Sequence, residues 1–242
     1  MLSLRGAVRA REMRASVAVG VSDPDFDSVV LLLDFAGADE ATDFTDLSNS
    51  GHVETFVGNP EIDTAVQYLG KNTIRFPGSG GGGGVITFPD HADWDFPGDF
   101  TIELGALFDV STTAQVLIST YDSETTAKGF WIQFNQSGGD KMNFGYGDDT
   151  LVTNAFTITD SLQYHVAVTR NGTDLRFFMN GVQVGSTVTD STDMTGATAG
   201  VSLGSHVSAQ YFDGSMGALR ITKGVARYTA NFTPPTEFYP IS

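Results

Sequence analysis

The chain has 242 residues, 40% of them hydrophobic, which fits one large all-β or α/β domain, or two small ones, with a substantial core. It contains no Cys, which excludes a disulfide scaffold, a zinc ribbon and a cysteine nucleophile, and its four His, at positions 52, 91, 165 and 206, are too scattered to indicate a His-rich metal site. The formal net charge of −16 argues against nucleic-acid binding through broad neutralisation of phosphates.

The N-terminal segment differs in charge from the rest of the chain. Residues 1–22 hold four Arg against one Glu, a net charge of +3, which leaves −19 for the remainder. The Arg residues interrupt this segment every two to four positions and leave no apolar core typical of a secretory signal, so we expect none. No run of apolar residues is long enough to cross a membrane. We expect residues 1–25 to form a basic extended arm that docks onto carboxylates of a partner. Its candidate contact residues are Arg5, Arg9, Arg11 and Arg14.

Short strands separated by turn residues are expected from residue 26 onward. Strict alternation of apolar and polar residues is clearest over 100–108, 130–135 and 164–169, and Asn180-Gly181 between two apolar runs is a strong hairpin signal. No amphipathic helix is evident, so the pattern predicts an all-β, antiparallel two-sheet sandwich in one domain, residues 26–242. Further strands are expected at 28–35, 53–57, 73–76, 85–88, 115–120, 142–146, 175–179, 182–184, 201–204 and 217–222.

The acidic residues are mostly Asp, which outnumbers Glu 22 to 7. Asp favours turns and caps, so this excess fits short strands joined by tight loops. The alternative interpretation is calcium binding, because carboxylate oxygens are hard ligands. Asp43 and Asp46, in a polar loop after the first strand, are the candidates for calcium, the one cofactor the sequence suggests.

Five stretches in consistent order carry a resemblance to a known family. The chain resembles the laminin G-like, concanavalin A-like jelly rolls of bacteriophage and marine viral virion proteins, such as tail fibres, head fibres and capsid decorations. This resemblance implies a jelly-roll sandwich, often with a glycan-binding concavity or loop rim and sometimes with a bound calcium. The stretches are VVLLLDFAGADEATDFTD, GNPEIDTA, TFPDHADWDFPGDFTIE, YHVAVTRNGTDLRFFMNGVQVGS and ALRITKGVARYTANFTPP.

Carbohydrate binding needs exposed aromatic planes and polar side chains that reach sugar hydroxyls. Trp131 is the leading candidate because alternation places it opposite the apolar face of its strand, although packing within the second sheet explains it equally well. Tyr146 and the loop acids Asp122, Asp148 and Asp149 complete the candidate ligand-binding set. Trp94, bracketed by Pro89 and Pro97, is expected to close one end of the core.

Glycoside hydrolysis is the enzymatic alternative, because glucanases share this architecture. It needs two carboxylates facing one cleft, and strands usually supply them as Glu-x-Asp-x-Glu. No such triplet is present, and no nucleophile elbow occurs in a strand-to-helix setting. We therefore expect no enzymatic activity and assign no catalytic residue.

The sequence and the resemblance together predict a structural protein of the virion surface. The arm would attach it to other capsid or tail proteins, and the outward jelly roll would bind host or environmental glycans. Two alternatives remain: a capsid cement or decoration protein without a glycan ligand, and a glycoside hydrolase. By analogy with fibres and decorations on three-fold axes, we expect a homo-oligomer, with a trimer as the first choice.

Overall fold

The computed structural model describes residues 22–109, 113–120, 128–135, 140–205 and 210–242. The Arg residues of the predicted arm and Asp122 lie outside these ranges. Within them, strands dominate, and the helical elements are three short 3-10 turns, η1 (Phe26–Ser28), η2 (Ser79–Gly81) and η3 (Ala92–Trp94). None of the described helices is long and apolar enough to cross a membrane.

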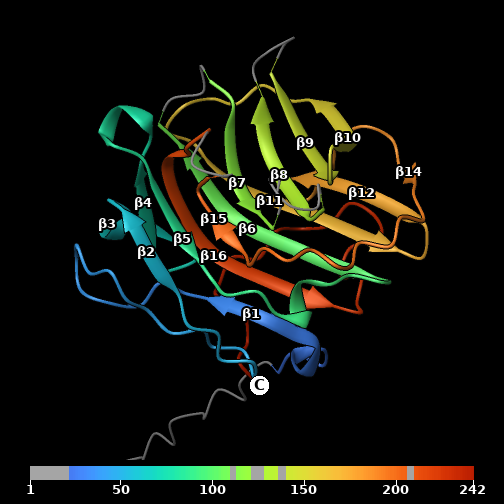
Figure 1. Ribbon diagram of the computed structural model, residues 1–242, viewed down its shortest axis with the longest axis horizontal. Helices are drawn as coiled ribbons and strands as arrows, with labels where there is room; N and C mark the ends of the chain where they lie inside the picture. The colour runs from blue at the N-terminus through green and yellow to red at the C-terminus, as the bar shows by residue number, and fades with distance from the viewer. Residues whose placement is uncertain (1–21, 110–112, 121–127, 136–139, 206–209) are drawn as a thin grey trace, which may run out of the picture.

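Two antiparallel sheets face each other, which confirms the predicted all-β jelly-roll sandwich (Figure 1). The larger has the order β13-β12-β11-β6-β16-β4-β3, with β1 on β16 and β14 on β12; the smaller has the order β10-β9-β8-β7-β15-β5-β2. The nine-stranded sheet contains β1 (Val29–Leu33), β3 (Glu61–Tyr68), β4 (Lys71–Pro77), β6 (Phe100–Phe108), β11 (Gln163–Asn171), β12 (Asp174–Met179), β13 (Val182–Gln183), β14 (Val188–Thr189) and β16 (Asp213–Lys223). The seven-stranded sheet contains β2 (Thr55–Gly58), β5 (Gly84–Thr87), β7 (Gln115–Ser119), β8 (Phe130–Asn135), β9 (Lys141–Tyr146), β10 (Asp149–Ala155) and β15 (Ser202–Leu203).

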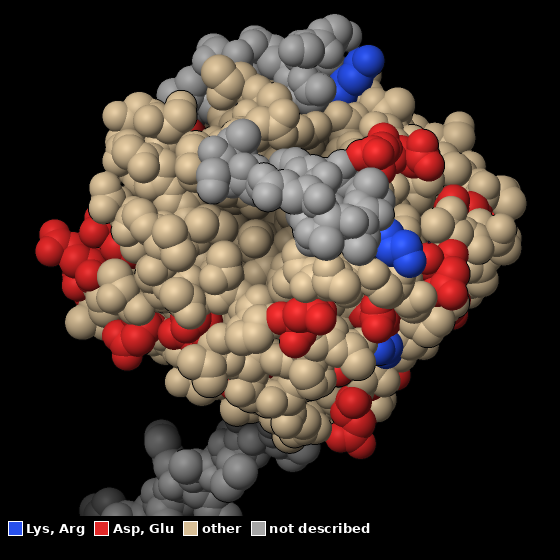
Figure 2. Space-filling view, viewed as in Figure 1, with Lys and Arg blue, Asp and Glu red and all other residues tan. Residues whose placement is uncertain are grey.

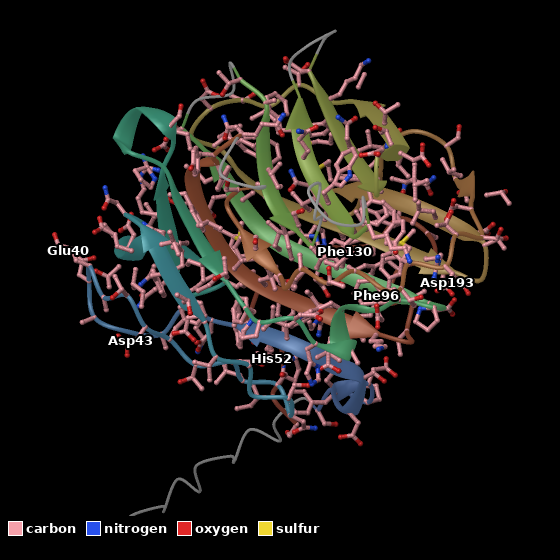
Figure 3. The ribbon with its side chains drawn as sticks, viewed as in Figure 1. Glu40, Asp43, His52, Phe96, Phe130 and Asp193 are labelled. Atoms are coloured by element: carbon pink, nitrogen blue, oxygen red, sulfur yellow. The ribbon has the colours of Figure 1, made fainter. Side chains whose placement is uncertain are left out.

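The main core lies between the sheets and is built largely from Phe. Alternate residues of β6 point into it, and Phe100 and Phe108 at the two ends of that strand are both fully buried. Phe96 stacks on Phe100 with ring centroids 4.8 Å apart and meets Phe130 of the opposite sheet at 5.3 Å (Figure 3). Trp94 is also buried, as expected of a residue that closes the core. The alternation seen in the sequence therefore reports the inner face of the sandwich correctly.

A second buried layer covers the outer face of the nine-stranded sheet. The C-terminal segment after β16 runs over that face, where Tyr239 packs with Val29, Leu32, Tyr68 and Ala218. The two ends of the described chain meet here, because the Asp23 N–H donates to the Ser242 carbonyl over 2.7 Å. Asp23, which the sequence interpretation placed in the arm, is thus tied into the sandwich.

Buried charges lie beneath this C-terminal segment, and Glu103 of β6 is at their centre. Its carboxylate is fully buried and meets the Arg220 guanidinium of β16 at 2.7 Å and His165 Nε2 of β11 at 3.0 Å. The Tyr228 hydroxyl, from the segment above, donates to the same carboxylate over 2.8 Å. Arg220 also meets Asp23 at 3.1 Å. The charges of Glu103, Arg220 and Asp23 are therefore paired with one another, which offsets the cost of burying them.

Candidate functional site

The outer face of the seven-stranded sheet carries the indole of Trp131. Alternation along β8 sends Phe130, Ile132 and Phe134 into the core and Trp131 outward. Trp131 pairs with Gly145 of β9, and a Cβ at position 145 would collide with the indole ring. The indole therefore lies directly over the glycine backbone, and its Nε1–H donates to the Gly147 carbonyl over 3.0 Å. A partly exposed aromatic ring is thus held in one orientation.

Amide side chains extend this face beside Trp131. Gln133 follows on the same side of β8, pairs across strands with Asn143 of β9 and donates through Nε2 to Gln210 Oε1. Asn143 is only 5% exposed, and its Oδ1 has no hydrogen-bond partner in the described part of the chain. A buried acceptor without a donor is destabilising by roughly 1–3 kcal/mol, so Asn143 is a strained element of this face rather than an exposed contact for a ligand. The sequence interpretation missed Asn143, although its alternation with Met142 and Phe144 predicts that it faces outward.

The turn between β9 and β10 borders the indole. Asp148 and Asp149 are exposed there, next to the Gly147 carbonyl that holds Trp131. Two of the predicted loop acids therefore adjoin the predicted aromatic plane. Carboxylates beside an aromatic plane can accept hydrogen bonds from vicinal hydroxyls of a sugar.

Tyr146 faces the opposite side of the sheet from Trp131. It packs against the main core, and its hydroxyl donates to the Thr195 carbonyl over 2.7 Å. Burial raises the pKa of Tyr146, and the charges of Asp193 and Asp95 raise it further. The structure thus separates Tyr146 from the surface that Trp131, Asp148 and Asp149 share.

The two Asp residues predicted as calcium ligands have different surroundings. Asp46 is buried, and its carboxylate accepts from the backbone N–H groups of Leu32, Ser48 and His52 at 2.9 Å each and from the Ser48 hydroxyl at 2.8 Å. It therefore organises its loop as an Asx-type cap. Asp43 is exposed at the margin of the same loop (Figure 3). Calcium binding stays a prediction; among the described residues, the group with three convergent metal-ligand atoms is His52, His91 and Asp93.

Acidic side chains are spread over the visible face of the molecule, with few basic ones between them (Figure 2). No broad basic area covers that face in the described part of the chain. This distribution agrees with the strongly negative net charge. The visible face lacks the row of basic side chains that binding to a nucleic-acid backbone requires.

Two antiparallel sheets around an aromatic core, with a fixed indole on the outer face of the smaller sheet, define a lectin-like β-sandwich domain. The chain belongs to the concanavalin A-like lectin/glucanases superfamily, whose model matches residues 79–227. A search of curated proteins gives no match.

Solved structures with the same fold include sugar-binding and toxin domains. Domain 4 of AbnA, an extracellular GH43 arabinanase from Geobacillus stearothermophilus solved in complex with arabinotriose, aligns with a TM-score of 0.62 and 18% identity over 82% of this chain and 94% of that one. Botulinum neurotoxin type C, whose cell entry depends on two ganglioside molecules, aligns at 0.61 and 13% identity over 83% of this chain. The binding domain of Paraclostridial Mosquitocidal Protein 1 aligns at 0.58 and 14% identity over 82%. The chain spans about half the length of the two toxin chains, 49% of each, and identities this low show the fold alone.

Proposed function

We propose that this domain binds glycans on the outer face of the seven-stranded sheet, with Trp131 as the stacking plane. The observation that carries the proposal is the fixed, partly exposed indole over Gly145, bordered by the exposed Asp148 and Asp149. A rigid ring loses little conformational entropy when a sugar stacks on it. Hydrogen bonds from the neighbouring amides and carboxylates would orient the sugar on the ring. The arabinotriose complex of one structural neighbour and the dependence of another on gangliosides for cell entry support this class of ligand.

Replacing Trp131 by Ala is expected to weaken glycan binding by about tenfold or more, since a lost aromatic contact of about 1.4 kcal/mol corresponds to one decade in Kd. The measurement is a glycan array followed by titration calorimetry with the best sugar. Tyr146→Phe is the matched control: it changes an aromatic residue on the opposite face of the same sheet and should bind as the unaltered chain does. If a correctly folded Trp131→Ala variant binds glycan with unchanged affinity, the binding site does not include this face.

The wider role that we propose is that of a virion surface protein, with the arm attached to capsid or tail proteins and the sandwich facing outward. The five stretches of resemblance to phage jelly rolls and the charge contrast between arm and body support it. A homo-oligomer, and a trimer in particular, would raise weak sugar affinity through avidity. If no sugar binds at millimolar concentration, capsid decoration without a glycan ligand becomes the better account.

Deleting residues 1–21 is expected to abolish attachment to the particle while leaving glycan binding intact. The deletion stops before Asp23 because that carboxylate pairs with Arg220 and Arg227 inside the sandwich. Replacing Arg5, Arg9, Arg11 and Arg14 together by Gln should give the same result, since Gln keeps length but loses charge. Co-sedimentation with purified particles measures attachment, and normal assembly of both variants would contradict the role of the arm.

We do not propose hydrolysis for this chain. The one described Glu on a central strand, Glu103, is fully buried beneath Tyr228 and cannot reach a polysaccharide. A reducing-end assay on the glycan that binds best separates the hydrolase alternative from simple binding.

A further inference from the structure

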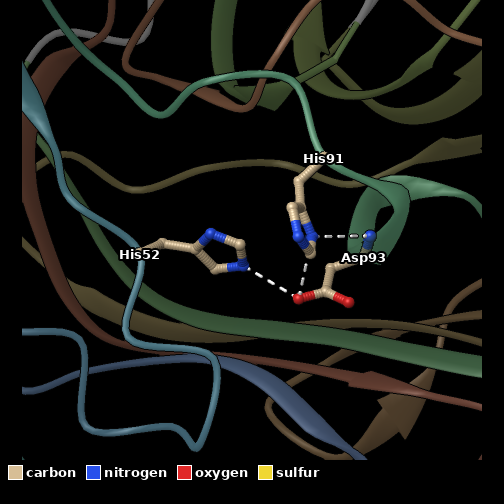
Figure 4. A group of neighbouring side chains, drawn as sticks. All are labelled: His52, His91 and Asp93. Atoms are coloured by element: carbon tan, nitrogen blue, oxygen red, sulfur yellow. Dashed lines mark hydrogen bonds and ion pairs between the residues drawn. The ribbon is translucent and has the colours of Figure 1, made fainter.

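Two loops far apart in the sequence bring three metal-ligand atoms together (Figure 4). His52 lies in the loop before β2, whereas His91 and Asp93 lie at η3, between β5 and β6. Asp93 Oδ2 is 2.9 Å from His52 Nε2 and 3.2 Å from His91 Nδ1. The three atoms, His52 Nε2, His91 Nδ1 and Asp93 Oδ2, all lie within 4.8 Å of one another.

The surroundings hold these side chains in place. The His52 ring packs on Trp94 with centroids 4.4 Å apart, and its side chain is only 10% exposed. The Ser50 hydroxyl donates to Asp93 Oδ2 over 2.8 Å, which orients the carboxylate. The Asp46 carboxylate accepts the His52 backbone N–H and so fixes the loop that carries the first imidazole. Orientation of this kind by outer partners is typical of metal sites.

His91 Nδ1 has two neighbours in Asp93. It accepts the Asp93 backbone N–H over 3.2 Å, which requires a lone pair on that nitrogen. Asp93 Oδ2, another atom with lone pairs, lies 3.2 Å from the same nitrogen. Because an imidazole nitrogen has a single lone pair, a cation held between Nδ1 and Oδ2 would have to displace the backbone N–H from Nδ1.

We propose that His52, His91 and Asp93 bind one Zn²⁺ ion. Tetrahedral zinc with bonds of about 2.0–2.1 Å needs donor atoms about 3.3 Å apart, so the two N···O distances of 2.9 and 3.2 Å require only small shifts. The two nitrogens lie within 4.8 Å of each other, which sets how far the imidazoles must move. Two imidazoles with one carboxylate suit a borderline ion such as Zn²⁺, whereas Ca²⁺ and Mg²⁺ prefer oxygen ligands.

Zinc binding needs the lone pair of His52 Nε2, the nitrogen that lies 2.9 Å from Asp93 Oδ2. The neutral ring would therefore bind the ion in the tautomer that carries its proton on Nδ1, with no net release of a proton. The side chain of His91 is 53% exposed, so the fourth position opens to solvent and takes a water molecule. The bound ion would cross-link the loop before β2 to η3, next to Trp94. It also adds positive charge to a strongly acidic body.

Titration calorimetry of the tag-free full-length chain with ZnCl₂, after treatment with EDTA, tests this site. We expect one zinc per chain, no displacement by Ca²⁺ or Mg²⁺, and tetrahedral d–d absorption bands when Co²⁺ replaces zinc. His91→Ala and Asp93→Asn should each weaken binding by about tenfold or more, because even changes to outer partners of a metal site cost roughly 10–100-fold. Asp90→Asn is the matched control: it removes the same charge from an exposed neighbour that provides no ligand atom, and it should leave the affinity unchanged.

Three results would overturn the proposal: no binding to the unaltered chain at millimolar zinc, stoichiometric binding that neither variant weakens, or octahedral Co²⁺ spectra with ready competition by Ca²⁺. Should Asp93→Asn fold poorly, as judged by its melting temperature in EDTA, His91→Ala carries the test. Its side chain is 53% exposed, so we expect this variant to fold. Glycan binding measured with and without zinc shows whether this site and the Trp131 face are independent.

Discussion

Replacing Glu103 by Gln is expected to lower the free energy of unfolding by about 3 kcal/mol. The carboxylate is fully buried and is the common partner of Arg220, His165 and Tyr228. Removing one partner of a buried ion pair typically costs roughly 3–5 kcal/mol, because it leaves the other charge uncompensated. We expect the lower end of that range since Asp23 still meets Arg220 at 3.1 Å. Urea denaturation at neutral pH measures the change.

Asp174→Asn serves as the control for this variant. It makes the same acid-to-amide change at a pair that is also short, with Arg176 Nη2 and Asp174 Oδ2 2.7 Å apart, but Asp174 is 46% exposed. Exposed pairs contribute about 0–1 kcal/mol, so this variant should unfold almost as the unaltered chain does. Equal losses in the two variants would mean that burial does not set the strength of the Glu103 network.

Most of the fold could be predicted from alternation, and the exceptions have a physical cause. The strand expected over 100–108 matches β6 residue for residue, because one of its faces packs against an apolar core. In contrast, β3 and β10 were missed. Many of their residues are exposed and polar, so the period of two is lost against the background of turn residues.

The candidate site was only partly predictable. Alternation along β8 gave the outward orientation of Trp131, and the same argument applied to β9 puts Tyr146 on the core side with Met142 and Phe144. Tyr146 was grouped with Trp131 because both are aromatic, without regard to the face of the sheet on which each lies.

Contacts between loops could not be predicted from the sequence pattern. The sequence interpretation expected no His-rich metal site because the four His are far apart, whereas the fold places the rings of His52 and His91 4.9 Å apart. Nothing in a sequence pattern tells which loops meet at the end of a sandwich. The burial of Glu103 escaped prediction for the same reason, since it depends on a C-terminal segment that crosses the outer face of β6.

The stability that Glu103 provides is expected to disappear in acid. Burial alone would raise the pKa of this carboxyl. The charge of Arg220, the hydrogen bond and charge of His165 and the hydrogen bond from Tyr228 outweigh it and lower the pKa from 4.5 to about 2. A carboxyl whose pKa is lower in the folded state stabilises the fold above its unfolded pKa and loses that contribution as the pH falls towards its folded pKa. The window is therefore from pH 4.5 down to about 2. A shift of this size corresponds to about 3 kcal/mol.

Many carboxylates titrate in this window, so the difference between the unaltered chain and Glu103→Gln is the quantity to follow. Gln does not ionise, and protonated Glu103 resembles it in charge and shape. We therefore expect the gap between the two unfolding free energies, about 3 kcal/mol above the window, to close steadily as the pH falls through it. Urea denaturation of both chains across a pH series gives the gap directly, and the Asp174→Asn variant should show no comparable convergence. A gap that stays constant down to about pH 2 would mean that Glu103 enters the fold already protonated, and the buried network would then be held by neutral hydrogen bonds rather than by its charge.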